Sequence, residues 1–297
     1  MRQICYTKHM FYGKTAAAAA LASFGLWMYC GLSRNLQVSR YVIDSDKIPA
    51  AFDGFKIVCL SDLHAGRVEG LMEQIEKEKP DAVFCTGDFF DGVQPWNETF
   101  GLITQLMKTA PVYFVSGNHE KYRMDWDEIE ARLKETGIHV LKNEQTALQR
   151  GEEVLWISGI DDPGHIVRDA QGVPRQIASE DRKAALKNAL NSLPVQSGFH
   201  MVLMHRASCF DEACRDDFDL FFCGHLHGGQ WRIGQTGIAG PGNEKRVDLF
   251  PKYSSGLYQK GNTRMIVSRG LSDQMVIPRF YNRPDLVSVQ LKSTKCT

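Results

Sequence analysis

The stretch FKIVCLSDLH, residues 55–64, starts as a short apolar run and ends in the polar sequence Asp62-Leu63-His64. Apolar runs of this length, bounded by turn residues, are typical of strands that are buried on both faces. The same pattern, an apolar run followed by polar or glycine residues, occurs four more times along the chain. We therefore expect strands at residues 55–60, 82–85, 112–115, 199–204 and 220–223.

A polar motif follows each expected strand. In open α/β sheets, ligands bind at the carboxyl ends of the strands, so we expect the five motifs to meet at one place. Carboxylate, amide and imidazole groups together predict a two-metal site and therefore a metal-dependent phosphoesterase. The motifs are Asp62-Leu63-His64, Gly87-Asp88-Phe89-Phe90-Asp91, Gly117-Asn118-His119-Glu120, His205 and Gly224-His225-Leu226-His227.

With these motifs in this order, the chain resembles the calcineurin-like metallophosphoesterase superfamily from about residue 56 to the C-terminus. It most resembles the bacterial membrane-associated branch, related to phosphodiesterases and hydrolases of UDP-diacylglucosamine. The resemblance implies an α/β fold of two packed mixed β-sheets flanked by helices, a four-layer αββα sandwich. Strands alternate with helices in the first half and crowd together in the second, which agrees with that fold. We expect helices at residues 68–78, 96–108, 125–136 and 179–190, and hairpin strands within 151–159 and 254–268.

The resemblance also implies a metal ligand set. Two divalent ions about 3.5–4 Å apart neutralise the charge of a phosphate ester and lower the pKa of a bridging water, which attacks as hydroxide. A mixture of carboxylate, imidazole and amide ligands suits Mn, Fe or Zn better than calcium. The implied ligands are Asp62, His64 and His227 for one ion, Asn118, His205 and His225 for the other, and Asp88 as the bridge.

Two further residues are the expected catalytic groups. By resemblance, His119 is the general acid that protonates the leaving group, a contribution of about 10²–10⁴ in rate. Asp91 matches the family carboxylate that orients this imidazole. Glu120 is expected to be a helix cap or a supporting group and is left out of the core site.

The expected reaction is hydrolysis of a phosphodiester or pyrophosphate bond, on a lipid or an envelope-linked molecule. Gly92 stands where phosphoprotein phosphatases have an arginine, which argues against a phosphoprotein substrate. Arg206-Ala207 after His205 departs from the membrane branch and leaves the shape of this loop open. The alternatives are a tethered phosphodiesterase for soluble small molecules and a metal-binding, non-catalytic scaffold. The presence of both His119 and Asp91 disfavours the scaffold.

The N-terminus contains an uncharged stretch at residues 15–32, flanked by basic residues. Because about 20 apolar residues span a bilayer, we expect an uncleaved transmembrane helix at 15–32. A cleaved signal peptide and a soluble or peripheral helix are the alternatives. The basic residues are slightly denser before the stretch, which predicts a single-pass cell-membrane protein with an extracytoplasmic catalytic domain. The expected units are an N-terminal segment (1–34), a linker with a first strand near 39–43 (35–54) and a metallophosphoesterase domain (55–297).

The composition fits one catalytic domain. The chain has 297 residues, of which 35 are basic and 35 are acidic. Hydrophobic residues make up 43% of the chain, which is enough for a large core. Because the charge is balanced, we expect no nucleic-acid partner, and we expect a monomer. Asp161 is expected in a plain turn near the site. Four histidines outside the motifs are expected to be structural: His9, His139, His165 and His200.

Overall fold

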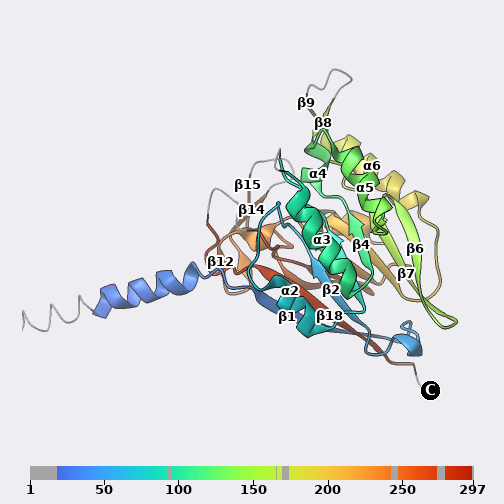
Figure 1. Cartoon of the computed structure of the whole chain (residues 1–297), viewed down its shortest axis with the longest axis horizontal. Helices are drawn as coiled ribbons and strands as arrows, with labels where there is room; N and C mark the ends of the chain where they lie inside the picture. The colour runs from blue at the N-terminus through green and yellow to red at the C-terminus, as the bar shows by residue number, and fades with distance from the viewer. Residues whose placement is uncertain are drawn as a thin grey trace, which may run out of the picture.

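The chain forms two six-stranded sheets with helices packed beside them (Figure 1). The computed structural model describes residues 19–92, 95–164, 166–168, 174–241, 247–272 and 278–295. Both sheets contain parallel and antiparallel neighbours. The predicted α/β fold of two mixed sheets flanked by helices is confirmed.

The first sheet joins the two ends of the described chain. β1 pairs in parallel with β18, the last strand, and β18 pairs antiparallel with β2. From β2 to β5 all neighbours are parallel, so their carboxyl ends lie along one edge. The order is β1 (Gln37–Ser45), β18 (Asp285–Ser293), β2 (Lys56–Leu60), β3 (Ala82–Thr86), β4 (Val112–Val115) and β5 (His139–Val140).

The second sheet contains the remaining long strands. β7, β10, β11 and β17 are parallel, and an antiparallel strand lies at each edge. The hairpin expected within 254–268 is confirmed as β16 and β17. Residues 153–160 pair instead with β6, a largely polar strand that no apolar run predicted. The order is β16 (Gly256–Lys260), β17 (Thr263–Val267), β11 (Leu220–Gly224), β10 (His200–Arg206), β7 (Glu153–Ile160) and β6 (Glu144–Arg150).

The central strands are buried on both faces, which explains their continuous apolar sequences. In β2, Ile57 lies in the core between the sheets, whereas Val58 lies in the core under the helices of the first sheet. Across the space between the sheets, the ring of Phe84 contacts the ring of Phe222 edge to face, with centroids 5.0 Å apart. This central core fixes the two sheets against each other and therefore fixes their strand ends.

Helices with apolar stripes cover the outer faces. In α3, Phe100, Ile103 and Leu106 recur at helical spacing and are buried under the first sheet. In α6, Leu186 and Leu190 pack in the core outside the second sheet. The four expected helices are confirmed. The covering helices are α2 (Leu71–Glu78), α3 (Asn97–Thr109) and α5 (Trp126–Glu135) on the first sheet, and α6 (Ser179–Ser192) and α7 (Phe210–Ala213) on the second.

Short elements surround the strand ends that carry the motifs. They are the helix α4 (Asn118–Tyr122), the 3-10 turns η2 (Ala207–Cys209) and η3 (His227–Gly229), and three small ribbons; a further 3-10 turn, η1 (Ala50–Phe52), lies at the opposite edge, before β2. The ribbons are β8 (Ile166–Arg168) with β9 (Pro174–Gln176), β12 (Arg232–Ile233) with β13 (Thr236–Gly237), and β14 (Ala239–Pro241) with β15 (Val247–Leu249).

The N-terminal segment corrects the expectation of a membrane helix. Residues 19–31 are helical and stand away from the sheets, while Trp27 packs against Phe280 with ring centroids 4.7 Å apart (Figure 1). Within the described part of the chain, no helix has both the length and the apolar character needed to cross a membrane. The predictions of a transmembrane helix at 15–32 and of a single-pass protein with an extracytoplasmic domain are therefore wrong; residues 15–18 lie outside the described residues.

Candidate metal centre and active site

The motif loops are tied together by backbone hydrogen bonds. The N–H of Asp62 donates to the carbonyl of Gly87 (3.0 Å), and the N–H of His64 donates to the carbonyl of Asp88 (2.8 Å). The N–H of His225, at the end of β11, donates to the carboxylate of Asp62 (3.1 Å). These bonds join loops of both sheets, so the expected meeting of the motifs occurs.

Five of the motif residues have a left-handed backbone, which is uncommon for residues other than glycine. This conformation turns the chain sharply as soon as a strand ends, so the side chain returns over the edge of the sheet. Such residues cluster at functional sites, where the surrounding structure holds them in place. Their φ angles are 54° for Asp62, 50° for His64, 57° for Asp88, 75° for His225 and 47° for His227.

The glycines before the motif residues permit close approach. A Cβ atom at Gly117 would overlap the carboxylate of Asp88, and one at Gly224 would overlap the hydroxyl of Ser61. Any larger residue at either position would push two motif loops apart. The glycine in each motif is therefore explained by the closeness of the loops.

The first donor group consists of Asp62, His64 and His227, whose ligand atoms all lie within 4.8 Å of one another. Nε2 of His64 faces Nε2 of His227 at 3.2 Å. Nε2 of His227 lies 3.5 Å from Oδ1 of Asp62. All three side chains are buried.

The second donor group consists of Asp88, His205 and His225, also within 4.8 Å. Nε2 of His205 lies 3.1 Å from Oδ2 of Asp88 and 3.2 Å from Nδ1 of His225. Nδ1 of His205 donates to the carbonyl of Thr86 (2.7 Å), which leaves Nε2 free to face the group. Oδ2 of Asp88 is also 3.9 Å from Nε2 of His64, so this carboxylate lies between the two groups.

The polar atoms of the site fit a binuclear metal centre. Among the described residues, the buried Oδ1 of Asn118 has no hydrogen-bond partner, as expected for an atom that binds a cation. Nε2 of His64 and Nε2 of His227 face each other too closely for a side chain to lie between them. Two imidazole nitrogens in this arrangement can bind the same ion. The carboxylates and imidazoles match divalent transition ions.

Burial and neighbouring charges set the protonation of the histidines. Burial, aided by Arg206, lowers the pKa of His225 well below its usual value, and burial with His64 does the same for His227. Burial alone would also lower the pKa of His205, but Asp88 raises it to about 10. Since only a deprotonated nitrogen binds a metal, His205 has to lose this proton to act as a ligand.

The carboxylate of Asp91 holds two imidazoles. Oδ1 lies 2.5 Å from Nδ1 of His119, and Oδ2 lies 3.1 Å from Nδ1 of His64. Burial opposes protonation of His119, but Asp88 and Asp91 raise its pKa to about 9. The side chain of His119 is 32% exposed, whereas the histidines of both donor groups are buried. His119 therefore lies at the more open side of the centre, and the neighbouring carboxylates favour its protonated form.

Glu120 caps α4 and supports the loop of Asp88, in agreement with the expected role of a helix cap or supporting group. Its buried carboxylate accepts hydrogen bonds from the N–H groups of Asp88 (2.8 Å), Phe89 (2.7 Å), Phe90 (2.9 Å) and Gly117 (2.8 Å). Burial and the charge of Asp88 raise the pKa of Glu120. An acidic residue three positions after a glycine at a strand end is the only sequence signal for this arrangement, and it also fits an ordinary helix cap.

Arg206 and Asp162 form a buried ion pair beside His225. This pair was not predicted from the sequence. Nε of Arg206 lies 2.8 Å from Oδ2 of Asp162, and Nη1 lies 3.0 Å from Nε2 of His225. The sequence signal for this ion pair was Arg206 itself, which departs from the family pattern after His205. The neighbouring Asp161 instead pairs with Lys121 (2.6 Å) and stabilises the loop after β4.

The histidines outside the motifs lie away from the donor groups where the structure describes them. His200 is buried in β10, where it lies 2.8 Å from the hydroxyl of Ser158. His139 stacks on Tyr113. His9 and His165 lie outside the described residues.

Comparison with known proteins identifies the class. A profile described as Calcineurin-like phosphoesterase matches residues 55–229, more than half of the chain, so the chain belongs to this family. It is similar to the uncharacterized metallophosphoesterase YkuE of Bacillus subtilis, at 27% identity over 97% of each chain. It is also similar to the phosphodiesterase YaeI of Escherichia coli, at 28% identity over 96% of this chain and 99% of the relative. The predicted superfamily and enzyme class, a hydrolase of phosphoester bonds, are confirmed.

A solved structure with a related fold is the phosphopantetheinyl hydrolase of Mycobacterium tuberculosis. It is 13% identical, has a TM-score of 0.45 and aligns with 73% of this chain and 89% of its own.

Proposed function

We propose that this protein hydrolyses a phosphodiester or pyrophosphate bond with the help of two divalent ions, Mn, Fe or Zn. The single observation that carries the proposal is the position of Asp88, a buried carboxylate that reaches both donor groups. A phosphoester hydrolase of this family needs such a bridge, because two like-charged ions must be held close together.

The proposed ligands follow the two donor groups. Asp62, His64 and His227 hold one ion, while His205, His225 and the amide oxygen of Asn118 hold the other. When bound, the ions neutralise the phosphate oxygens and activate water at neutral pH. The left-handed turns and the Glu120 cradle keep the donors in place without rearrangement.

The proposed acid is His119. Its Nδ1 is held by Asp91, so Nε2 is the atom that delivers a proton to the departing alkoxide. Asp91 keeps the imidazolium protonated and fixes the plane of the ring. A ligand atom of His119 also lies within 4.8 Å of those of His64 and Asp88. The role of acid is favoured over that of a ligand because Asp91 holds Nδ1 of His119 and this imidazole is the most exposed of the cluster.

The substrate proposal is limited to the bond itself. Gly92, in place of the arginine of phosphoprotein phosphatases, still argues against a phosphoprotein. The expectation of a lipid or envelope-linked molecule depended on the membrane anchor, which is not supported. The family resemblance and the phosphodiesterase named among the relatives favour a phosphodiester.

The test is turnover of bis(p-nitrophenyl) phosphate by full-length protein after chelation and after reloading with Mn. We expect negligible turnover without ions and recovery on loading. The matched pair of variants is His225→Asn, in the centre, and His139→Gln, a histidine on β5 outside it. Loss of turnover in the first variant and its retention in the second supports the proposal. Full activity of the chelated protein, or of His225→Asn, contradicts it.

A further inference from the structure

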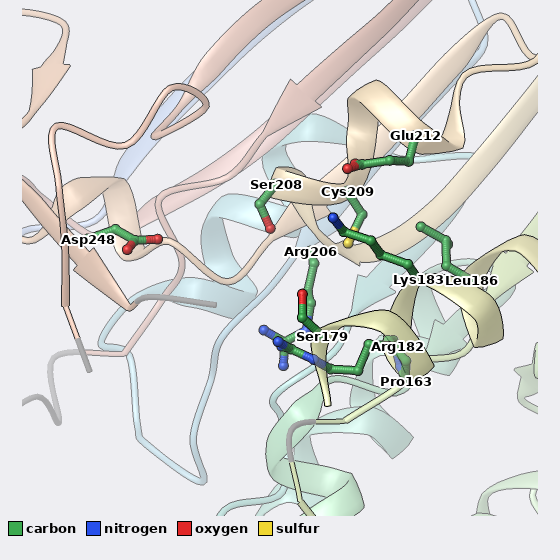
Figure 2. A pocket seen from close by; sticks show the side chains of 10 residues that line it. All are labelled: Pro163, Ser179, Arg182, Lys183, Leu186, Arg206, Ser208, Cys209, Glu212 and Asp248. Atoms are coloured by element: carbon green, nitrogen blue, oxygen red, sulfur yellow. The ribbon is translucent and has the colours of Figure 1, made fainter. Parts of the chain in front are cut away.

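A cavity of about 290 Å³ is lined in part by Arg206, the residue that follows His205 (Figure 2). Its walls come from the start of α6, from the segment after β10 and from β15. This volume is near the lower end for ligand pockets, about 300–1,000 Å³, and suits one chemical group rather than a whole cofactor.

Arg206 connects the cavity to the candidate centre. Its side chain is 2% exposed, lines the cavity and lies 3.0 Å from Nε2 of His225. Arg206 also forms an ion pair with Asp162, with Nε 2.8 Å from Oδ2. A group held against Arg206 in the cavity would therefore be separated from His225 by this one side chain.

Positive charge gathers at one side of the cavity. Figure 2 shows the guanidinium groups of Arg182 and Arg206 on the same side, with the hydroxyl groups of Ser179 and Ser208 also lining the space. Guanidinium groups bind phosphoryl and carboxylate groups through paired hydrogen bonds, and hydroxyl groups can complete such a shell.

The acidic residues of the cavity lie elsewhere on its wall. Glu212 lies near the end of Lys183 in the view, and Asp248 lies apart on β15 (Figure 2). Cys209 is also in the wall, but burial raises the pKa of its thiol to about 11, so it is a neutral group rather than a nucleophile. The arginine side is thus the part of the cavity that favours an anion.

We infer that this cavity binds a second anionic group of the substrate, a phosphoryl or carboxylate group separate from the scissile phosphoester. The inference rests on the proposed function and deepens it, because it assigns the substrate to phosphodiesters that carry a further negative charge. It also places one of the lining arginines, Arg206, beside His225, whereas the position after Asp91 has Gly92.

The kinetic test uses three substrates of Mn-loaded, full-length protein: p-nitrophenyl propyl phosphate and its analogues in which the propyl group ends in a phosphonate or a carboxylate. We expect kcat/KM to be at least about ten-fold higher for one charged analogue, the effect of a charge-assisted hydrogen-bond pair. Which analogue is preferred identifies the anion. Equal kcat/KM for all three overturns the inference, while the proposed function stands.

The matched variants are Arg182→Gln and Lys187→Gln. Both remove one positive charge from α6, but Lys187 is exposed and does not line the cavity. Arg182→Gln should raise KM for the charged analogue and bring the ratio of the substrates close to one, whereas Lys187→Gln should keep the wild-type ratio. A ratio that is unchanged in Arg182→Gln contradicts the inference.

A binding measurement separates the two proposals. Calorimetry compares 3-phosphonopropionate, which has two anionic groups, with propylphosphonate, which has one. We expect the first to bind about ten-fold more tightly to the wild type and to lose this advantage in Arg182→Gln. If no diester is turned over, the proposed function fails, and equal binding of the two phosphonates independently rejects the anion site.

Discussion

The two sheets contribute to the candidate centre in different ways. Loops of the first sheet supply both carboxylates, Asp62 and Asp88. Loops of the second sheet supply three imidazoles, His205, His225 and His227. The carboxylates therefore come from one sheet and most of the imidazoles from the other. Neither sheet alone supplies all of the proposed metal ligands.

The support behind the two halves also differs. On the first sheet, four backbone N–H groups converge on Glu120 and fix the loop of Asp88. The imidazoles of the second sheet are supported by the carbonyl of Thr86, which ends β3 of the first sheet, and by the pair of Arg206 with Asp162. Groups that orient metal ligands commonly change metal affinity or activity 10–100-fold when altered. The predictions below test how unequal the halves are.

The largest expected effect is the loss of the bridge. Asp88→Asn removes the negative charge that both donor groups share, so we expect the loss of at least one ion and a fall in turnover of several orders of magnitude. Elemental analysis and turnover of bis(p-nitrophenyl) phosphate measure this. Two ions per chain in an active Asp88→Asn protein would end the assignment of Asp88 as the bridge.

The next effect concerns proton transfer at the open side of the centre. His119→Ala should slow esters with poor leaving groups by about 10²–10⁴, because their alkoxides need a proton on departure. Activated aryl esters should be slowed far less, and metal content should stay near normal. The ratio of rates on an alkyl and an aryl diester is the measurement, and equal slowing of both would remove His119 from this role.

A smaller effect should follow from weakening the first sheet's support. Glu120→Gln keeps the size of the side chain but directs amide hydrogens at backbone N–H donors, leaving some of them unpaired. We expect metal affinity to fall about 10–100-fold and stability to fall by about 1–3 kcal/mol. Manganese titration and urea unfolding report these changes. Wild-type values for both would show that the cradle does not hold the loop of Asp88.

The smallest expected effect lies in a region that belongs to neither half. Removing residues 1–34 deletes the helix whose Trp27 rests on Phe280, but it leaves β1, which starts at Gln37. Turnover of a small aryl diester should stay within about two-fold of the full chain, as for changes remote from a site. A truncated protein that loses its ions would instead tie this segment to the centre.

The sequence predicted the parts of the molecule that depend on local pattern. The apolar runs predicted β2, β3, β4, β10 and β11, because strands buried on both faces leave a continuous apolar signal. The motifs were placed correctly at strand ends. The meeting of Asp62 with His227 was implied only by the family resemblance, because β2 and β11 belong to different sheets.

Other features depend on contacts between distant segments. β6 carries mostly polar residues and is a strand only because it pairs with β7. The Glu120 cradle needs N–H groups from two loops, and Arg206 at the end of β10 meets Asp162 in the loop after β7. The N-terminal prediction failed because an uncharged stretch with a run of alanines has the length of a membrane helix but little hydrophobicity.

The central claim is that the two sheets together hold two ions, and counting ions tests it most directly. Elemental analysis of the Mn-loaded wild type should give two ions per chain, and His227→Ala should retain fewer than two while staying folded. One ion or none per chain in the fully active wild type would contradict the account.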